Sequence, residues 1–200
     1  FGQLFSQSFV QRLAAPVFYE LGVQPNFQSN PLNLSDVEII KAAQDSEYLD
    51  GIAYSSSNVV SLSAKLNYSP RLFAGRKTRF NLQLNHHYYH DIPERSYQSY
   101  SLGVRQSLGK YRYLNLGYWI LPEYYLRNYR YQDIRTLRTN REICKFGTDR
   151  FWLGYKHRIT KRNTIEYRLT LRNEIYQAPF SHYDMHMLEG DLKLNLGQFN

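Results

Sequence analysis

The segment TRFNLQLNHHYY, residues 78–89, decides the fold, because apolar and polar side chains alternate along almost its whole length. Phe80, Leu82, Leu84 and Tyr88 share one side of an extended chain, and the residues between them are Asn, Gln or His. Successive side chains of a β-strand point to opposite faces of the sheet. The segment is therefore predicted to be a strand with one apolar face and one polar face.

The same two-residue period recurs along the chain and is clearest in residues 164–176, where Tyr167 and Leu169 lie opposite Glu166 and Arg168. Segments of about ten residues with aromatic side chains near their ends are typical of strands that cross a membrane. The alternation predicts about eight strands, over residues 17–27, 58–69, 78–90, 97–108, 111–121, 149–159, 164–176 and 186–197.

The connections between these segments also alternate. Those after even-numbered strands are tight (69–77, 108–110 and 160–163), whereas those after odd-numbered strands are longer or richer in aromatic and charged residues (28–57, 90–97, 122–148 and 177–185). Bacterial outer-membrane barrels place short turns on the periplasmic side and long loops outside. Strand period and connection length thus indicate the same architecture independently.

The first long connection contains a helix signal. Ser35 and Glu38 match a capping box and precede IIKAAQ, which predicts about two helical turns. The helix is either a lid or plug over the mouth of a barrel, or a short element that packs a long loop.

Composition restricts the alternatives. The 200 residues have a mean hydropathy of −0.58 and no apolar run near the roughly 18 residues that a membrane-spanning helix needs. The 19 tyrosines favour strands and membrane interfaces. The net charge is +8, but the basic residues are spread without a binding motif, so we expect no nucleic-acid partner. The single cysteine, Cys144, excludes an internal disulfide framework and falls in a candidate polar loop.

Residues 17–197 resemble bacterial outer-membrane β-barrel proteins as a class. The resemblance implies an all-β, antiparallel up-and-down transmembrane β-barrel in the Gram-negative outer membrane, porin-like, with about eight strands that are either complete or part of a larger barrel. Residues 1–16 would be a periplasmic segment and 17–200 the barrel. The ending LKLNLGQFN departs from the class, because Phe199 is out of phase with Leu194 and Leu196. The chain starts at Phe1 without a signal sequence, so it is either mature or a fragment. The soluble alternative is a lipocalin-like cup that buries its Leu and Tyr faces.

Charged side chains fall on the polar faces of the predicted strands. An Arg or Lys against lipid costs about 2–4 kcal/mol at the bilayer midplane, so these faces are expected to point into the lumen. Eight strands leave an interior that side chains fill, whereas more strands would let the same residues line an anion-favouring pore. The predicted lumen charges are Lys65, Arg79, Arg105, Lys156, Arg158, Glu166, Arg168, Arg172, Glu174, Glu189, Asp191 and Lys193, with Glu20.

The stretch 124–142 is the richest in basic and aromatic residues. Its arginines could grip anionic lipopolysaccharide phosphates or a partner protein, or the stretch could be a solvated strand extension and loop. The predicted outer-rim binding residues are Tyr124, Tyr125, Arg127, Tyr129, Arg130, Arg135 and Arg138.

Two histidine groups lie at predicted outer strand ends. His86 and His90 could hold a metal ion, and His182, Asp184 and His186 could converge as metal ligands or as an Asp that orients a His for acid–base chemistry. Asp184 and His186 look loosely similar to the rim pair of omptin-type outer-membrane proteases. The alternative is a set of histidines mixed with tyrosines at the level of the lipid headgroups.

Three hypotheses of function follow. The first is a non-enzymatic scaffold, anchor or subunit of an envelope assembly, which contacts outer-membrane lipid, lipopolysaccharide and other envelope proteins and needs no cofactor. The second is an anion-preferring channel or transporter. The third is a hydrolase active at the outer rim.

Overall fold

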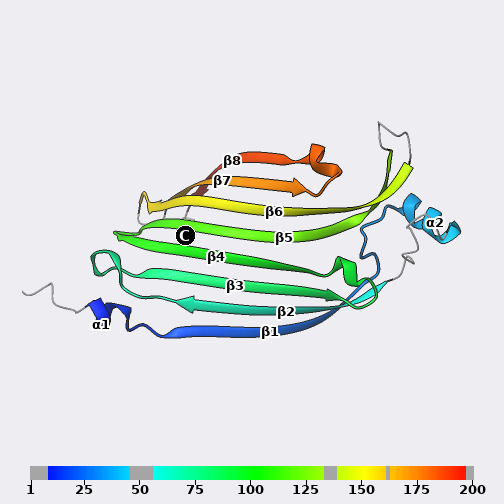
Figure 1. Cartoon of the computed structure of the whole chain (residues 1–200). Helices are drawn as coiled ribbons and strands as arrows, with labels where there is room; N and C mark the ends of the chain where they lie inside the picture. Colours follow the sequence, from blue (N-terminus) through cyan, green and yellow to red (C-terminus); the bar gives the residue numbers. More distant parts are fainter. Residues whose placement is uncertain (1–8, 46–55, 133–138, 161–162, 197–200) are drawn as a thin grey trace, which may run out of the picture.

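A single antiparallel sheet makes up most of the chain. The computed structural model describes residues 9–45, 56–132, 139–160 and 163–196. Eight strands follow one another in chain order, each paired with the next (Figure 1). The strands are β1 (Val17–Gln28), β2 (Ser57–Tyr68), β3 (Thr78–Tyr89), β4 (Tyr97–Gly109), β5 (Arg112–Gln132), β6 (Thr139–Arg158), β7 (Thr164–Tyr176) and β8 (Met185–Asn195). The helices are α1 (Phe9–Leu13), α2 (Asp36–Gln44) and the 3₁₀ turns η1 (Phe73–Gly75), η2 (Pro93–Arg95) and η3 (Phe180–Tyr183).

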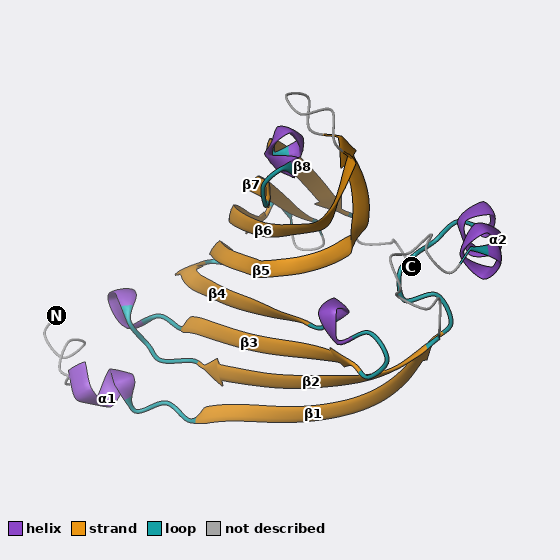
Figure 2. Cartoon of the chain, turned by 45° about the vertical axis from the view of Figure 1, so that its right-hand side comes forward, coloured by secondary structure: helices purple, strands orange, loops and turns teal. Residues whose placement is uncertain are grey.

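The sheet is curved and open (Figure 2). Its two edges are β1 and β8, and within the described residues these strands do not pair with each other. The predicted all-β, up-and-down order of eight antiparallel strands is confirmed. The closed circuit of strands that defines a barrel is not formed by the described strands, because β1 and β8 each keep one unpaired edge.

The prediction of a long loop over 122–148 is wrong. Most of this stretch extends β5 and β6, which remain paired as far as Gln132 and Thr139. The register of the β5–β6 pair shifts at two places, between Leu121 and Tyr124 and between Tyr125 and Arg127. Pro122 lies in the first of these, where a residue without an N–H costs no ladder hydrogen bond. The tyrosines that suggested an interface here also favour strands.

The up-and-down topology places successive connections at alternate ends of the strands, but their lengths do not sort as predicted, because 69–77 is longer than 90–96 and 177–184. The connections 29–56, 90–96 and 177–184 lie at one end of the strands, named here the long-loop end, and 69–77, 110–111 and 159–163 lie at the other, the short-turn end. Helix α2 is at the long-loop end and α1 at the short-turn end (Figure 1). None of the helices in the described residues combines the length and hydrophobicity needed to cross a bilayer.

The strand register keeps every strand in the same phase. One cross-strand row consists only of apolar side chains and defines the apolar face: Tyr19, Leu66, Leu82, Leu102, Tyr118, Phe151, Leu171 and Leu188. The next row lies on the opposite, polar face: Glu20, Lys65, Gln83, Ser101, Trp119, Arg150, Arg172 and Met187.

The apolar face is the exposed one. Leu82, Leu116, Leu169 and Leu194 keep 38%, 36%, 49% and 52% of their surface accessible. A lipocalin-like cup would bury these leucines in a packed interior, so that alternative is contradicted. The packed apolar cluster of the described residues lies instead at the long-loop end, where Leu32, Leu34, Ile92 and Tyr125 are buried with Ile39 and Ala42 against them.

The polar face is tightly packed at its centre. Trp152 of β6 lies directly opposite Gly117 of β5, and a Cβ atom on Gly117 would overlap the Trp152 ring. A glycine is required at this position because the indole occupies the space of any side chain.

We therefore expect Gly117→Ala to lower the free energy of unfolding by about 1–3 kcal/mol, since the Trp152 ring must move out of its packed position. Urea unfolding monitored by tryptophan fluorescence measures this change. Gly190→Ala is the matched control, because nothing lies within 4 Å of its added Cβ. An equal loss in both variants would contradict the packing role of Trp152.

Candidate functional site

The predicted lumen charges share the polar face, and many of them pair with one another. Lys65 Nζ lies 2.9 Å from Glu20 Oε1 on the neighbouring strand. Glu166 is shared between Arg168, at 3.3 Å, and Lys156, at 3.9 Å. Arg172 pairs with Glu174 two residues along β7. Oppositely charged side chains thus neutralise one another across and along the strands of this face.

Some arginines of the polar face have no carboxylate partner among the described residues. Arg105 Nε donates to Asn115 Oδ1 at 2.7 Å, and its guanidinium lies 5.8 Å from the Tyr113 ring. Arg150 lies over the Trp119 ring at 5.2 Å and Arg158 over the Tyr111 ring at 3.5 Å. Aromatic faces attract cations, but they leave the positive charge in place. The described polar face therefore carries an excess of positive charge.

A hollow of about 250 Å³ lies on this face towards the short-turn end. Strands β3 to β7 all contribute to its wall, which indicates that the sheet curves around the polar face. The lining side chains that bear on its chemistry are Arg79, Asn81, Arg105, Asn115, Glu166 and Arg168.

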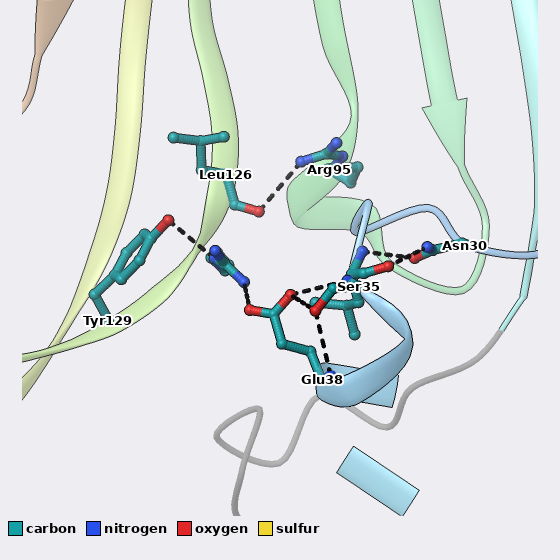
Figure 3. A network of polar contacts seen from close by, with 8 residues as sticks. Asn30, Ser35, Glu38, Arg95, Leu126 and Tyr129 are labelled. Carbon is teal, nitrogen blue, oxygen red and sulfur yellow. Dashed lines mark hydrogen bonds and ion pairs between the residues drawn. The ribbon is translucent and has the colours of Figure 1, made fainter. Parts of the chain in front are cut away.

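At the long-loop end, α2 begins with the predicted capping box, which is confirmed. Ser35 N donates to Glu38 Oε2 at 2.9 Å, and Glu38 N donates to Ser35 Oγ at 3.4 Å. The other carboxylate oxygen of Glu38 pairs with Arg127 of β5, whose Nε donates to Tyr129 Oη at 2.9 Å (Figure 3). The cap of the helix is thereby tied to the extension of β5.

Arg95 of η2 is buried, with 2% of its surface accessible. Its Nη1 donates to the carbonyl oxygen of Leu126 at 3.2 Å (Figure 3). The same nitrogen donates to the carbonyl oxygen of Tyr125 at 2.6 Å, and the guanidinium lies 4.5 Å from the Tyr124 ring. These carbonyls lie at the irregularity of β5, where the ladder does not satisfy every backbone group. Sequence reasoning missed Arg95, because a single arginine in a short loop carries no periodic signal.

Aromatic rings form a continuous row across β3 to β7 near this end. Consecutive ring centroids are 4.6, 5.1, 5.5 and 5.2 Å apart from His87 through Tyr97, Tyr124 and Phe146 to Tyr176. Beyond the row lies a cavity of about 450 Å³ lined by Leu126, Tyr129, Cys144, Tyr176, Phe180, His182 and Tyr183. The placement of Cys144 in a polar loop is wrong, because it is a buried residue of β6 in the wall of this cavity.

The histidine candidates each have a separate contact. His182 Nδ1 lies 3.3 Å from Pro179 O, Asp184 Oδ1 accepts from Tyr176 N at 2.7 Å, and His186 Nδ1 lies 2.9 Å from Asn173 Oδ1. His86 faces the apolar side, and its buried Nδ1 has no partner in the described structure. No group of three His, Cys, Asp or Glu residues among the described ones could hold a metal ion. The contacts of His182, Asp184 and His186 are each with a different partner, and none joins two of these residues. The metal and acid–base hypotheses therefore remain predictions.

The predicted rim residues are placed unequally. Arg127 is paired with Glu38 and keeps 32% of its side chain accessible, whereas Tyr125 is buried in the apolar cluster and presents no surface to a partner. Tyr124 and Tyr129 are half-buried in ring contacts. Arg130 lies opposite Arg141 in the β5–β6 ladder, while Arg135 and Arg138 lie outside the described residues.

Searches against protein-family models, curated proteins and solved structures find no match to this chain. A functional assignment therefore depends on the distribution of charge and hydrophobicity over the sheet and on the contacts at its long-loop end.

We expect Arg95→Met to lower the free energy of unfolding by about 2–4 kcal/mol, because two buried carbonyl groups lose their donor. Glu94→Gln, an exposed neighbour in the same 3₁₀ turn, is the control and should change little. Chemical unfolding of both variants tests the difference. A neutral Arg95→Met would show that water satisfies the carbonyls of β5 equally well.

The docking of α2 should depend on pH through Glu38. Hydrogen bonds from the Ser35 backbone N–H and hydroxyl, with a smaller contribution from Arg127, hold the pKa of Glu38 below its ordinary value. A carboxyl whose pKa is depressed by folding stabilises the fold above its unfolded pKa and loses that contribution as pH falls through the folded pKa. Amide hydrogen exchange of residues 36–44, corrected for intrinsic rates, should therefore accelerate on acidification through that range. Glu38→Gln should exchange faster at neutral pH and show no such transition.

Proposed function

We propose that this chain is an integral outer-membrane β-barrel protein that serves as a non-enzymatic scaffold or anchor and presents its long-loop end for recognition. The single observation that carries the proposal is the row of exposed apolar side chains that crosses all eight strands, from Tyr19 to Leu188, with the charged side chains on the opposite face. An apolar surface of this extent is stable in hydrocarbon and not in water.

The dimensions of the apolar face support a bilayer as its partner. A membrane-spanning strand needs about 9–11 residues at a tilt of about 45°, and the apolar positions of β2 and β3 extend over residues 60–68 and 80–88. Tyrosines lie near both limits of this face, with Tyr68 and Tyr155 towards the short turns and Tyr88 towards the long loops. Aromatic side chains at both limits of the apolar face are a feature of outer-membrane barrels.

Bilayer insertion also requires every backbone group to be paired, since an open edge is not tolerated in hydrocarbon. We infer that the edges of β1 and β8 are paired in the membrane. The ion pairs of the polar face, such as Lys65 with Glu20, then form a polar core, which favours a scaffold. The proposed partners are outer-membrane lipid, lipopolysaccharide and envelope proteins at the long-loop end.

An anion-preferring channel is the second candidate. Arg79 and Arg105 favour it, because neither has a carboxylate partner in the described sheet. Planar-bilayer recordings of the purified protein separate the two roles. We expect no stable conductance from a scaffold with a filled interior, and reproducible anion-selective steps would favour the channel instead.

The membrane proposal predicts opposite responses from two neighbouring positions of β7. Leu169→Arg places a charge on the apolar face and should destabilise the membrane-inserted protein by about 2–4 kcal/mol. Thr170→Arg places the same charge on the polar face, opposite Glu189, and should be much milder. Urea unfolding from lipid vesicles and the heat-dependent shift in gel mobility measure both variants. If Leu169→Arg folds as well as Thr170→Arg, the apolar face does not contact lipid.

A further inference from the structure

We propose that the hollow on the polar face binds a tetrahedral oxyanion, a phosphate or phosphomonoester, through Arg79, Arg105 and Arg168. This inference goes beyond the anchoring role, because it depends on the charges of the sheet and not on what the long-loop end recognises. All three arginines line the hollow, and none of them is a residue of the long-loop end.

Two of these arginines form a like-charge pair without a local explanation. Arg79 of β3 lies directly opposite Arg105 of β4 on the same face. Like charges opposite each other in an antiparallel pair destabilise the sheet. Within the described part of the chain, no carboxylate pairs with either guanidinium, and Arg105 uses its Nε on the neutral amide of Asn115 at 2.7 Å. A bound anion would neutralise both charges.

A third arginine, Arg168, lines the same hollow. The row that starts at Arg79 and Arg105 continues through Asn115 and Gly154 to Arg168 of β7. The short side chains in the middle of the row leave a hollow of about 250 Å³ between the arginines of its two sides. One wall of the cavity thus carries the Arg79–Arg105 pair, and the other carries Arg168, which is paired with Glu166 and lies opposite Asp191 in the ladder.

The positive charges that line the hollow outnumber the negative ones. Glu166 is the one carboxylate among the residues that line the hollow, and it is already shared between Arg168 and Lys156. The lining therefore retains a positive excess. Guanidinium groups present several N–H donors in a plane that matches the oxygens of phosphate, and the amides of Asn81 and Asn115 provide neutral donors in the same cavity.

Phosphate binding to the purified full-length chain in detergent tests the proposal. Inorganic phosphate is titrated by calorimetry at constant ionic strength in chloride, and saturable binding to one site is expected. Arg79→Gln and Arg105→Gln should each weaken binding by about tenfold, because each removes a charge-assisted contact. Glu166→Gln should strengthen binding by about threefold, since it removes the competing carboxylate.

Arg150→Gln is the matched control. Arg150 lies on the same face and also has no carboxylate partner among the described residues, but it stacks on Trp119 and does not line the hollow. Its loss should leave phosphate affinity unchanged. If Arg150→Gln weakens binding as much as Arg105→Gln, or if chloride competes as well as phosphate, only the general charge of the face is involved and the site does not exist.

A stability measurement provides an independent readout. In phosphate-free buffer, Arg105→Gln should raise the midpoint of thermal unfolding, because the like-charge pair is relieved. At the same concentration, phosphate should stabilise the wild-type protein more than this variant. A variant less stable than wild type without phosphate would overturn the argument from repulsion. The comparison of Leu169→Arg with Thr170→Arg tests membrane insertion, and the phosphate titrations test the anion site. Failure of one proposal can therefore be told apart from failure of the other.

A second probe tests whether the site takes free phosphate or a phosphomonoester. sn-Glycerol 3-phosphate is a soluble phosphomonoester with the glycerol phosphate group of phosphatidic acid. If it binds more tightly than inorganic phosphate, the site takes a phosphomonoester of this kind, and if it binds more weakly, the site takes free phosphate. Absence of saturable binding by both probes would overturn the proposal.

Discussion

Successive side chains of a strand point to opposite faces, and this constraint organises the whole molecule. Because the eight strands pair without any slip of phase through the middle of the sheet, the alternation within each strand becomes an alternation of entire rows, apolar from Tyr19 to Leu188 and polar from Glu20 to Met187. A slip of one residue in any pair would move the polar-face side chains of the displaced strand onto the apolar face. Register is therefore enforced at every strand by the separation of charge from hydrocarbon.

Because the apolar face of the sheet is exposed, the packing that a hydrophobic core usually provides is found elsewhere in the molecule. The large apolar side chains of the sheet are exposed, so they do not pack against one another as a core. Two other interactions hold the shape: ion pairs and glycine–tryptophan packing on the polar face, and the cluster around Ile92 and Tyr125 at the long-loop end. Arg95 belongs to this second group, because it connects η2 to the backbone of β5 where the ladder is irregular.

The sequence was sufficient for whatever follows from periodicity and capping. Seven strand starts, the capping box at Ser35 and the face of every predicted lumen charge come from local patterns that repeat. The extensions of β5 and β6 could not be predicted in this way, because alternation is broken by the irregularities near Pro122 and Leu126. Arg95 was missed for a related reason, since its partners are backbone carbonyls that leave no trace in the sequence.

The number of strands around the polar face determines what its charges can do. Any strand that pairs with β1 must present an apolar side chain beside Leu21, and any strand that pairs with β8 must do the same beside Leu192. β1 and β8 run in opposite directions, and each has the apolar side chains that the other edge requires of its partner. Closure over eight strands would bring the polar side chains of the two edges together around an interior with room for at most one small ligand. A wider circuit would leave the arginines around the hollow in contact with solvent. The guanidinium groups around the hollow thus enclose a single anion or line a selective surface according to the radius of the closed sheet.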